Sequence, residues 1–155
     1  MQSNFYVSLS GQVAFINQNT KAVLGFGTIT GNVANDSITV MGTLPVPSGL
    51  SLTNQQVVLD VNGVAKAFTL NSKGQAGSGN STFKLMVPKG KKTGTFTMKL
   101  NKGTFATTLA SVLPNENDTK KSVTLAITIL FNKSIFTHNQ KVSYTAKKGN
   151  MGMAK

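Results

Sequence analysis

Apolar and polar residues alternate along most of the chain, and the clearest alternation lies on both sides of Asn62-Gly63. Asn-Gly is the dipeptide that best suits a type I′ turn, because both central residues of that turn have positive φ. A turn at this point pairs Val61 with Val64 and Val57 with Phe68. We therefore predict a β-hairpin with one buried face, formed by Val57, Leu59, Val61, Val64, Phe68 and Leu70, with Lys66 as its polar exception.

The same period of two residues recurs in other segments. Residues 122–131 form the longest strand expected, and residues 82–87 form a shorter one. A second hairpin is predicted from a strand at 96–100, a turn at 101–103 and a return strand at 105–109. No apolar period of 3.6 residues continues through three helical turns, so we expect almost no helix. The predicted fold is an all-β, antiparallel β-sandwich of about nine to eleven strands. Its shorter strands occupy 5–16, 22–33, 37–44, 135–136 and 142–146.

We interpret residues 1–155 as a single β-sandwich domain. The Gly-rich stretch 73–79 is expected to be flexible and is the candidate boundary between two halves, 1–79 and 80–147, followed by a flexible basic tail at 148–155. The segments 37–77 and 103–152 share a plan, in which a long apolar strand ends in an Asn-containing turn and a return strand follows. This similarity indicates either a duplication or the regular turns that any β-protein shows when compared with itself.

Cysteine is absent, so no disulfide holds the fold and no thiol chemistry is available. The core is adequate, since nine Phe add bulk to it. No apolar run of about 18 residues exists, so we expect no membrane span. The N-terminus has no basic region followed by an apolar one, so it is not a signal peptide. Either the protein stays inside the cell, or the sequence is a mature or excised module.

The net charge is +12, because 16 Lys stand against four acidic residues and Arg is absent. This excess gives a solvated surface or attracts a polyanion, such as acidic polysaccharide, nucleic acid or an anionic cell surface. The missing Arg argues against sequence-specific nucleic-acid binding, which favours bidentate Arg contacts. The candidate polyanion contacts lie in expected loops and in the tail, and they form one patch only if the fold gathers them. They are Lys89, Lys91, Lys92, Lys120, Lys121, Lys147 and Lys148.

Candidate chemistry is sparse. His138 is the only histidine, and we expect it in an exposed turn at 137–140 without a catalytic role, since a triad also needs an oriented carboxylate. Four acidic residues argue against a paired-carboxylate glycosidase. Residues 115–118 could contribute to a calcium site but lack the spacing of a dedicated loop, so a polar turn is the simpler interpretation. We predict no catalytic, cofactor-binding or metal-binding residue, and no enzyme.

The N-terminal stretch has one further interpretation. Its apolar residues alternate as in a strand, and such a strand at a chain end could complete a neighbour's sheet and link copies into a filament. The alternative is that it pairs within its own domain. The residues of this candidate assembly strand are Phe5, Val7, Leu9, Val13 and Phe15.

Three segments, 68–79, 102–110 and 142–150, resemble Ig-like or adhesin-like β-sandwich modules of large bacterial cell-surface proteins. The resemblance covers residue 37 to the C-terminus, rests on pattern, and brings no catalytic residue with it. It implies an extracellular, structural or adhesive module, often one of several in a long chain. The partners we expect are copies of itself or neighbouring modules and, from the charge, acidic polysaccharide or another polyanion. The alternatives are a self-assembling filament subunit that adds strands through its N-terminal segment, and a Lys-rich polyanion-binding module.

Overall fold

The computed structural model describes residues 13–15, 21–26 and 35–155. Within this part of the chain it contains strands and one short helix, α2 (Phe105–Thr108). The strands are β1 (Val13–Phe15), β2 (Lys21–Phe26), β3 (Asp36–Pro45), β4 (Gln56–Val61), β5 (Val64–Thr69), β6 (Gln75–Ser78), β7 (Ser81–Met86), β8 (Thr93–Gly103), β9 (Asp118–Phe131), β10 (Ser134–Lys147) and β11 (Met151–Ala154).

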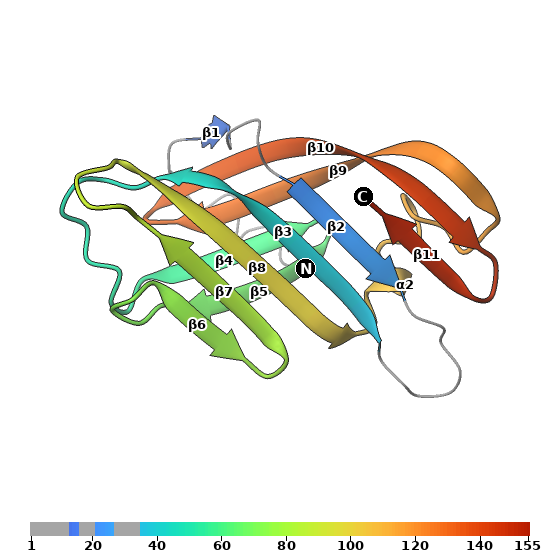
Figure 1. Ribbon diagram of the computed structural model, residues 1–155, viewed down its shortest axis with the longest axis horizontal. Coiled ribbons are helices and arrows are strands. Elements are labelled where there is room, and N and C mark those ends of the chain that lie inside the picture. Colours follow the sequence, from blue (N-terminus) through green and yellow to red (C-terminus); the bar gives the residue numbers. More distant parts are fainter. Residues whose placement is uncertain (1–12, 16–20, 27–34) are drawn as a thin grey trace.

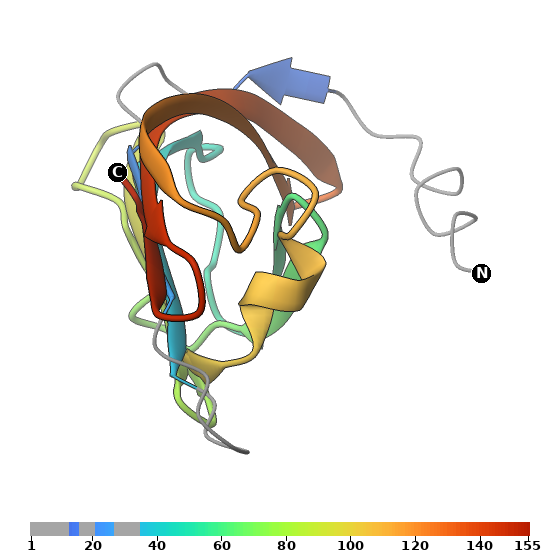
Figure 2. The ribbon, with the colours of Figure 1, turned by 90° about the vertical axis from the view of Figure 1, so that its right-hand side faces the viewer.

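Hydrogen-bonded neighbours follow the order β5-β4-β9-β10-β11-β2-β3-β8-β7-β6, with β1 beside β10. This continuous sheet folds over on itself into two facing layers (Figures 1 and 2). We call β5, β4 and the part of β9 and β10 that continues their row layer A, and β11, β2, β3, β8, β7 and β6 layer B. Every described strand pair is antiparallel except β1 with β10, which is parallel. The predicted all-β, antiparallel sandwich is confirmed.

The predicted Asn62-Gly63 hairpin is confirmed in its register and in its buried face. Val57 lies opposite Phe68, and Val61 opposite Val64. Asn62 and Gly63 have φ values of 50° and 99°, as a type I′ turn requires. The predicted apolar residues are all buried, and they are Val57, Leu59, Val61, Val64, Phe68 and Leu70.

Tertiary contacts hold this turn in place beyond its local preference. The Asn62 side-chain Oδ1 accepts a hydrogen bond from the backbone N–H of Ala126, at 2.8 Å, and its own backbone N–H donates to the Ala126 carbonyl, at 2.9 Å. The Gly63 N–H donates to Asp60 Oδ1, at 2.9 Å. These contacts tie the end of β4 to β9, its neighbour in layer A.

The long hairpin β9–β10 joins the two layers. Val123, Leu125, Ile127, Ile129 and Phe131 are buried, as predicted for this longest apolar stripe. Both strands have 14 residues, and they arch from one layer to the other (Figure 2). A bulge occurs where Tyr144 pairs with Lys121 and Ala146 with Asp118, and Lys120 there has a positive φ of 54°.

The predicted second hairpin, at 96–109, is wrong. Strand β8 continues to Gly103, and residues 105–108 form helix α2. The cause is tertiary: Asp36, which is buried at 1% exposure on β3, accepts the backbone N–H of Ala106 on its Oδ2, at 2.9 Å. Phe105 and Leu109 are four residues apart, a spacing that fits one turn of a helix as well as an alternating strand. Leu109 is buried and points into the core.

The predicted flexible tail is wrong for residues 151–154. They form β11, which lies between β10 and β2 and joins the two layers. Ala154 is fully buried, and Ser143 and Lys155 exchange two backbone hydrogen bonds. Small side chains at alternate positions let this strand fit close to Tyr144.

The Gly-rich stretch 73–79 also differs from expectation. Residues 75–78 form strand β6, and the β6–β7 hairpin spans the expected boundary between the halves at 79–80. Gly74 has a φ of +71°, and a side chain there would collide with the Leu85 backbone.

The proposed duplication matches the structure only in part. The β4–β5 and β9–β10 hairpins both turn on two residues with positive φ. The segment predicted to begin the second copy contains α2 where the first copy has strand β3.

Candidate functional site

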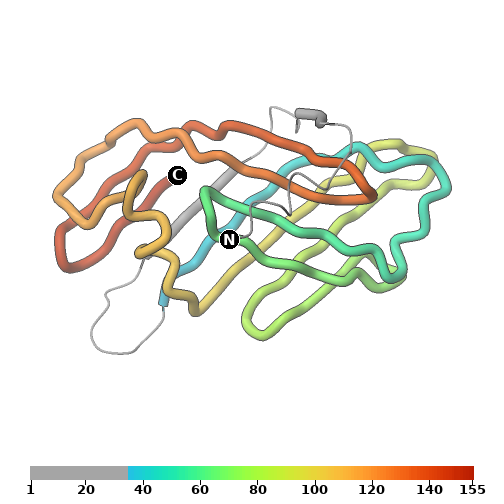
Figure 3. Tube along the Cα trace, turned by 180° about the vertical axis from the view of Figure 1, so that it is seen from behind, coloured from blue at the N-terminus to red at the C-terminus, as the bar shows by residue number. Residues whose placement is uncertain are grey.

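The structure separates the Lys residues predicted to contact a polyanion into two groups. Lys89, Lys91 and Lys92 lie in or beside the β7–β8 turn, at the left end of the molecule in Figure 1. The four others lie at the right end, where β9 begins and the β10–β11 turn follows (Figure 1). Figure 3, from behind, shows the same separation. The seven residues therefore do not form one patch.

Acidic side chains reduce the positive charge of the right-hand group. Lys121 Nζ lies 3.2 Å from Glu116 Oε1 and 3.8 Å from Asp118 Oδ2. This mixed arrangement is less suited to a polyanion than a surface with lysines alone.

His138 does not lie in a turn, as predicted, but in the middle of strand β10, opposite Ile127. Its ring nitrogen Nε2 is 3.2 Å from Gln140 Oε1 on the same side of the strand. The polar run 137–140 resembles a turn in sequence, yet pairing with β9 along its whole length keeps it extended. No carboxylate hydrogen bond to this imidazole occurs among the described residues.

The polar turn at 115–118 fastens the β10–β11 turn to the body of the protein. Asn115 Oδ1 accepts the backbone N–H of Gly149, at 2.9 Å, and Asn117 Oδ1 accepts that of Lys148, at 3.0 Å. These amide oxygens are the ligands that calcium would need, and they are already used. In residues 35–155 no group of three or more His, Cys, Asp or Glu side chains could hold a metal ion.

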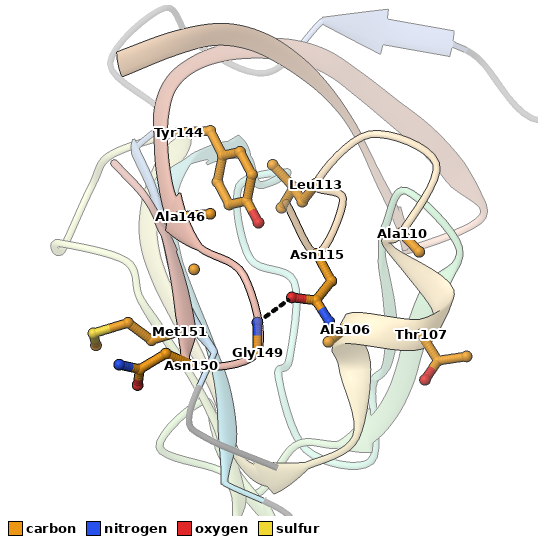
Figure 4. Close-up of a pocket in the computed structure, with 11 residues that line it drawn as sticks. Ala106, Thr107, Ala110, Leu113, Asn115, Tyr144, Ala146, Gly149, Asn150 and Met151 are labelled. Atoms are coloured by element: carbon orange, nitrogen blue, oxygen red, sulfur yellow. Dashed lines mark hydrogen bonds between the residues drawn. The ribbon is translucent and has the colours of Figure 1, made fainter. Parts of the chain in front are cut away.

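A cavity of about 350 Å³ lies between this turn, helix α2 and the β10–β11 hairpin (Figure 4). Tyr144 and Leu113 point toward the cavity, whereas Thr107, Asn150 and Met151 point away from it (Figure 4). The rest of its lining consists of Ala106, Ala110, Asn115, Ala146, Gly149 and Gly152.

Tyr144 is the one titratable side chain that lines this cavity. Its hydroxyl donates a hydrogen bond to the Pro114 carbonyl, at 2.7 Å. Burial, with smaller contributions from the negative charges of Asp118 and Glu116, raises the pKa of this hydroxyl above its ordinary value. The hydroxyl therefore stays protonated and neutral at physiological pH.

The outer face of layer B carries a different set of side chains. Along β3, β8 and β7, the side chains that point away from the core are mainly Thr, with Met and Lys between them. In cross-strand register, Thr39 pairs with Lys99 and Lys99 with Thr82, while the next row joins Met41, Thr97 and Lys84, and the third joins Thr43, Thr95 and Met86. We call these nine residues the Met–Thr–Lys face.

Two properties distinguish this face. The large apolar side chains that are exposed among the described residues are all methionines, and all lie on the outer side of layer B; Met41 is 40% exposed and Met86 56%. The others are Met151 and Met153 on β11. No acidic side chain belongs to the face, so Lys84 and Lys99, which are diagonal neighbours, have no counter-charge there.

Sequence reasoning missed this face because it treated Thr95, Thr97 and Lys99 only as the polar side of a strand. The available signal was the alternation Thr-Phe-Thr-Met-Lys at 95–99, since the solvent side of a strand usually carries more charge. The strands beside β8 are determined by the topology, so the local sequence does not show which side chains lie next to it.

The candidate assembly strand is described only at its end. Val13, Ala14 and Phe15 form β1 and pair in parallel with residues 135–137 of β10 in the same chain. Phe5, Val7 and Leu9 lie outside the described residues. The described part of the strand thus pairs within its own domain.

No family model, no curated protein and no solved structure matches this chain. The resemblance to bacterial cell-surface modules stays a prediction. Among the described residues, no helix is long and apolar enough to cross a membrane.

Proposed function

We propose that this chain is a non-enzymatic structural or adhesive module of a bacterial cell surface, and that it adheres through the Met–Thr–Lys face. The observation that carries the proposal is the absence of acidic side chains on this face, which combines exposed Met with Lys84 and Lys99. Methionine suits an adhesive surface because its flexible, polarisable side chain adapts to irregular partners. Two lysines without counter-charge favour an anionic partner, and the class we propose is acidic polysaccharide.

The chemistry of the cavity supports the non-enzymatic part of the proposal, since its one titratable side chain is a neutral, hydrogen-bonded tyrosine. The cell-surface part comes from the resemblance. Antibody labelling of intact and lysed source cells tests it: labelling of intact cells supports a surface location, and labelling only after lysis contradicts it.

Heparin, as a probe acidic polysaccharide, tests the adhesive face. The affinity of the chain is measured across a salt series, together with Lys84→Gln/Lys99→Gln and the matched control Lys73→Gln/Lys141→Gln, which removes the same charge at other exposed sites. The logarithm of the binding constant falls as the logarithm of the salt concentration rises. Loss of two ionic contacts is expected to make this fall shallower in the face variant, with a slope smaller in magnitude by about two. An equal loss in the control would show that net charge, and not this face, determines binding.

A second candidate function is filament formation through the N-terminal strand. The observation that favours it is the short parallel pairing of β1 with the edge of β10, in a sheet whose other described pairs are antiparallel. A three-residue strand at an edge is easily exchanged for that of another copy. Electron micrographs of concentrated protein test this candidate: fibres support it, and single particles alone exclude it.

A further inference from the structure

The outer face of layer A differs from that of layer B in both size and charge. Where the four strands pair, a row runs across them from Ala67 through Val58 and Leu130 to Ile135. The next row joins Ala65, Asp60, Thr128 and Thr137. Thr69 and Gln56 flank the first row, and Ala126 and Asn139 flank the second. We call these residues the layer A face.

Leu130 shows how apolar this face is. It is only 9% exposed, but it points away from the core and does not belong to the buried core cluster. Its cross-strand neighbours Val58 and Ile135 are half-buried on the same face. A leucine at the centre of an outer face, with Val and Ile beside it, is unusual for the solvated side of an antiparallel sheet.

The charge of this face is also unusual for this chain. Asp60 is its only charged side chain among the described residues, although the chain as a whole has 16 Lys and a net charge of +12. The nearest outward lysine on β10, Lys141, lies beyond Asn139, past the part of β9 that pairs with β4. Lys133, in the β9–β10 turn, borders the first row at its end, so the lysines lie around this face and not within its rows.

From these observations we infer that the layer A face packs against the same face of a second copy of this chain. Two copies with a charge of +12 repel each other, so they can approach only through a surface that carries almost no positive charge. An acidic partner would instead be attracted to lysine-bearing surfaces. Ala65, Ala67 and Ala126 are small and exposed, and they allow two sheets to approach to about 10 Å, the usual spacing of packed sheets.

The size of the face sets the expected strength of this contact. Four strands about 4.8 Å apart, with about 20 Å of length each, cover about 400 Å² per copy, or about 800 Å² in total. This area lies below that of stable complexes, so we expect a reversible dimer with a Kd on the order of 100 µM. Local concentration on a surface or within a multi-module chain would strengthen such a contact.

Sedimentation velocity of the full chain from about 10 µM to about 1 mM tests the inference. The unmodified chain is expected to shift from monomer to dimer in this range, and more readily at high salt, which screens the repulsion between copies. Val58→Lys and Ala126→Lys each place a positive charge on the layer A face and are expected to weaken the dimer at least tenfold. Gln75→Lys adds the same charge at an exposed position of β6, in the other layer, and is expected to dimerise like the unmodified chain.

Circular dichroism checks that each variant is folded. Ala126 is exposed, so Ala126→Lys is the substitution less able to disturb the core. A chain that stays monomeric up to about 1 mM at high salt overturns the inference. A dimer that persists in both face variants also overturns the inference, because the contact would then lie elsewhere. These substitutions leave β1 and its pairing with β10 untouched, so a contact through β1 would survive in both variants.

Discussion

The two outer faces of the sandwich differ, although both layers share one hydrophobic core. Layer A turns Ala67, Val58 and Leu130 outward, with a single charged residue on the whole face. Layer B turns outward rows of Thr with exposed Met and unpaired Lys. Since the inner sides alone are enough to build a sandwich, the outer sides are free to differ, and we propose a separate partner for each: a second copy for layer A and an anionic surface for layer B.

The largest expected effect is the difference in stability between an inward and an outward substitution in layer B. Phe96 is fully buried, and its ring stacks on that of Phe83, so Phe96→Ala is expected to lower the free energy of unfolding by about 4 kcal/mol. Thr95→Ala, on the adjacent outward position, is expected to change it by less than about 0.5 kcal/mol. Urea unfolding measures both. A cost above about 1 kcal/mol for Thr95→Ala would mean that the outer face is needed for the fold.

Leu130 tests the corresponding claim for layer A. Because it is nearly buried although it points outward, Leu130→Ala is expected to cost about 2 kcal/mol, between the core and an ordinary outward position. The same variant is expected to weaken the dimer. A cost no larger than that of Thr95→Ala would show that Leu130 lacks the neighbours that we assign to it.

Tyr144 tests the corner where β10 passes from one layer to the other. Tyr144→Phe removes the hydrogen bond to the Pro114 carbonyl and is expected to cost about 1 kcal/mol at neutral pH. Because the pKa of Tyr144 is raised in the folded state, the unfolded chain loses this proton first as pH rises. Its stabilising contribution is therefore complete below about pH 10 and is lost as pH rises through the folded-state pKa.

Urea midpoints of the unmodified chain and of Tyr144→Phe on both sides of pH 10 measure this effect. The difference between them is expected to narrow above about pH 10. A constant difference would show that the hydroxyl titrates alike in the folded and unfolded states.

The smallest expected effect concerns the methionines of layer B. Met41→Leu with Met86→Leu keeps the apolar area but removes the flexible thioethers, so we expect an unchanged urea midpoint and a heparin affinity lowered a few-fold. Titration of heparin against this double variant measures it. An unchanged heparin affinity would show that the lysines alone, and not the methionines, account for adhesion.

Much of the frame follows from local sequence, because alternation and turn chemistry act over a few residues. Asn62-Gly63 determines both a turn and a register, and the stripe from Val123 to Phe131 has no competing pattern. Helix α2 was missed because its N-terminal N–H is held by Asp36, 70 residues earlier in the chain. Strand β11 was missed because the buried positions of Met-Gly-Met-Ala hold Gly and Ala and form no bulky apolar stripe, and its pairing with β10 and β2 is not local.

The candidate sites depend even more on distant contacts. His138 was assigned to a turn because its neighbours are polar, whereas β9 keeps the segment extended. The lysines are individually visible in the sequence. Only the topology shows that Lys89 and Lys147 lie at opposite ends of the molecule and that Lys84 and Lys99 are diagonal neighbours on adjacent strands. Apart from the β4–β5 hairpin, both faces arise from strand neighbours that the sequence does not reveal.

The central claim is that the Met–Thr–Lys face is the surface that meets an anionic partner, and methionine oxidation tests it most directly. Exposed thioethers are oxidised to sulfoxides by dilute peroxide, and mass spectrometry gives the rate at each methionine. With heparin present, we predict slower oxidation of Met41 and Met86, while buried Met98 stays unreactive throughout. Unchanged rates at Met41 and Met86 under conditions where heparin is bound would contradict the account.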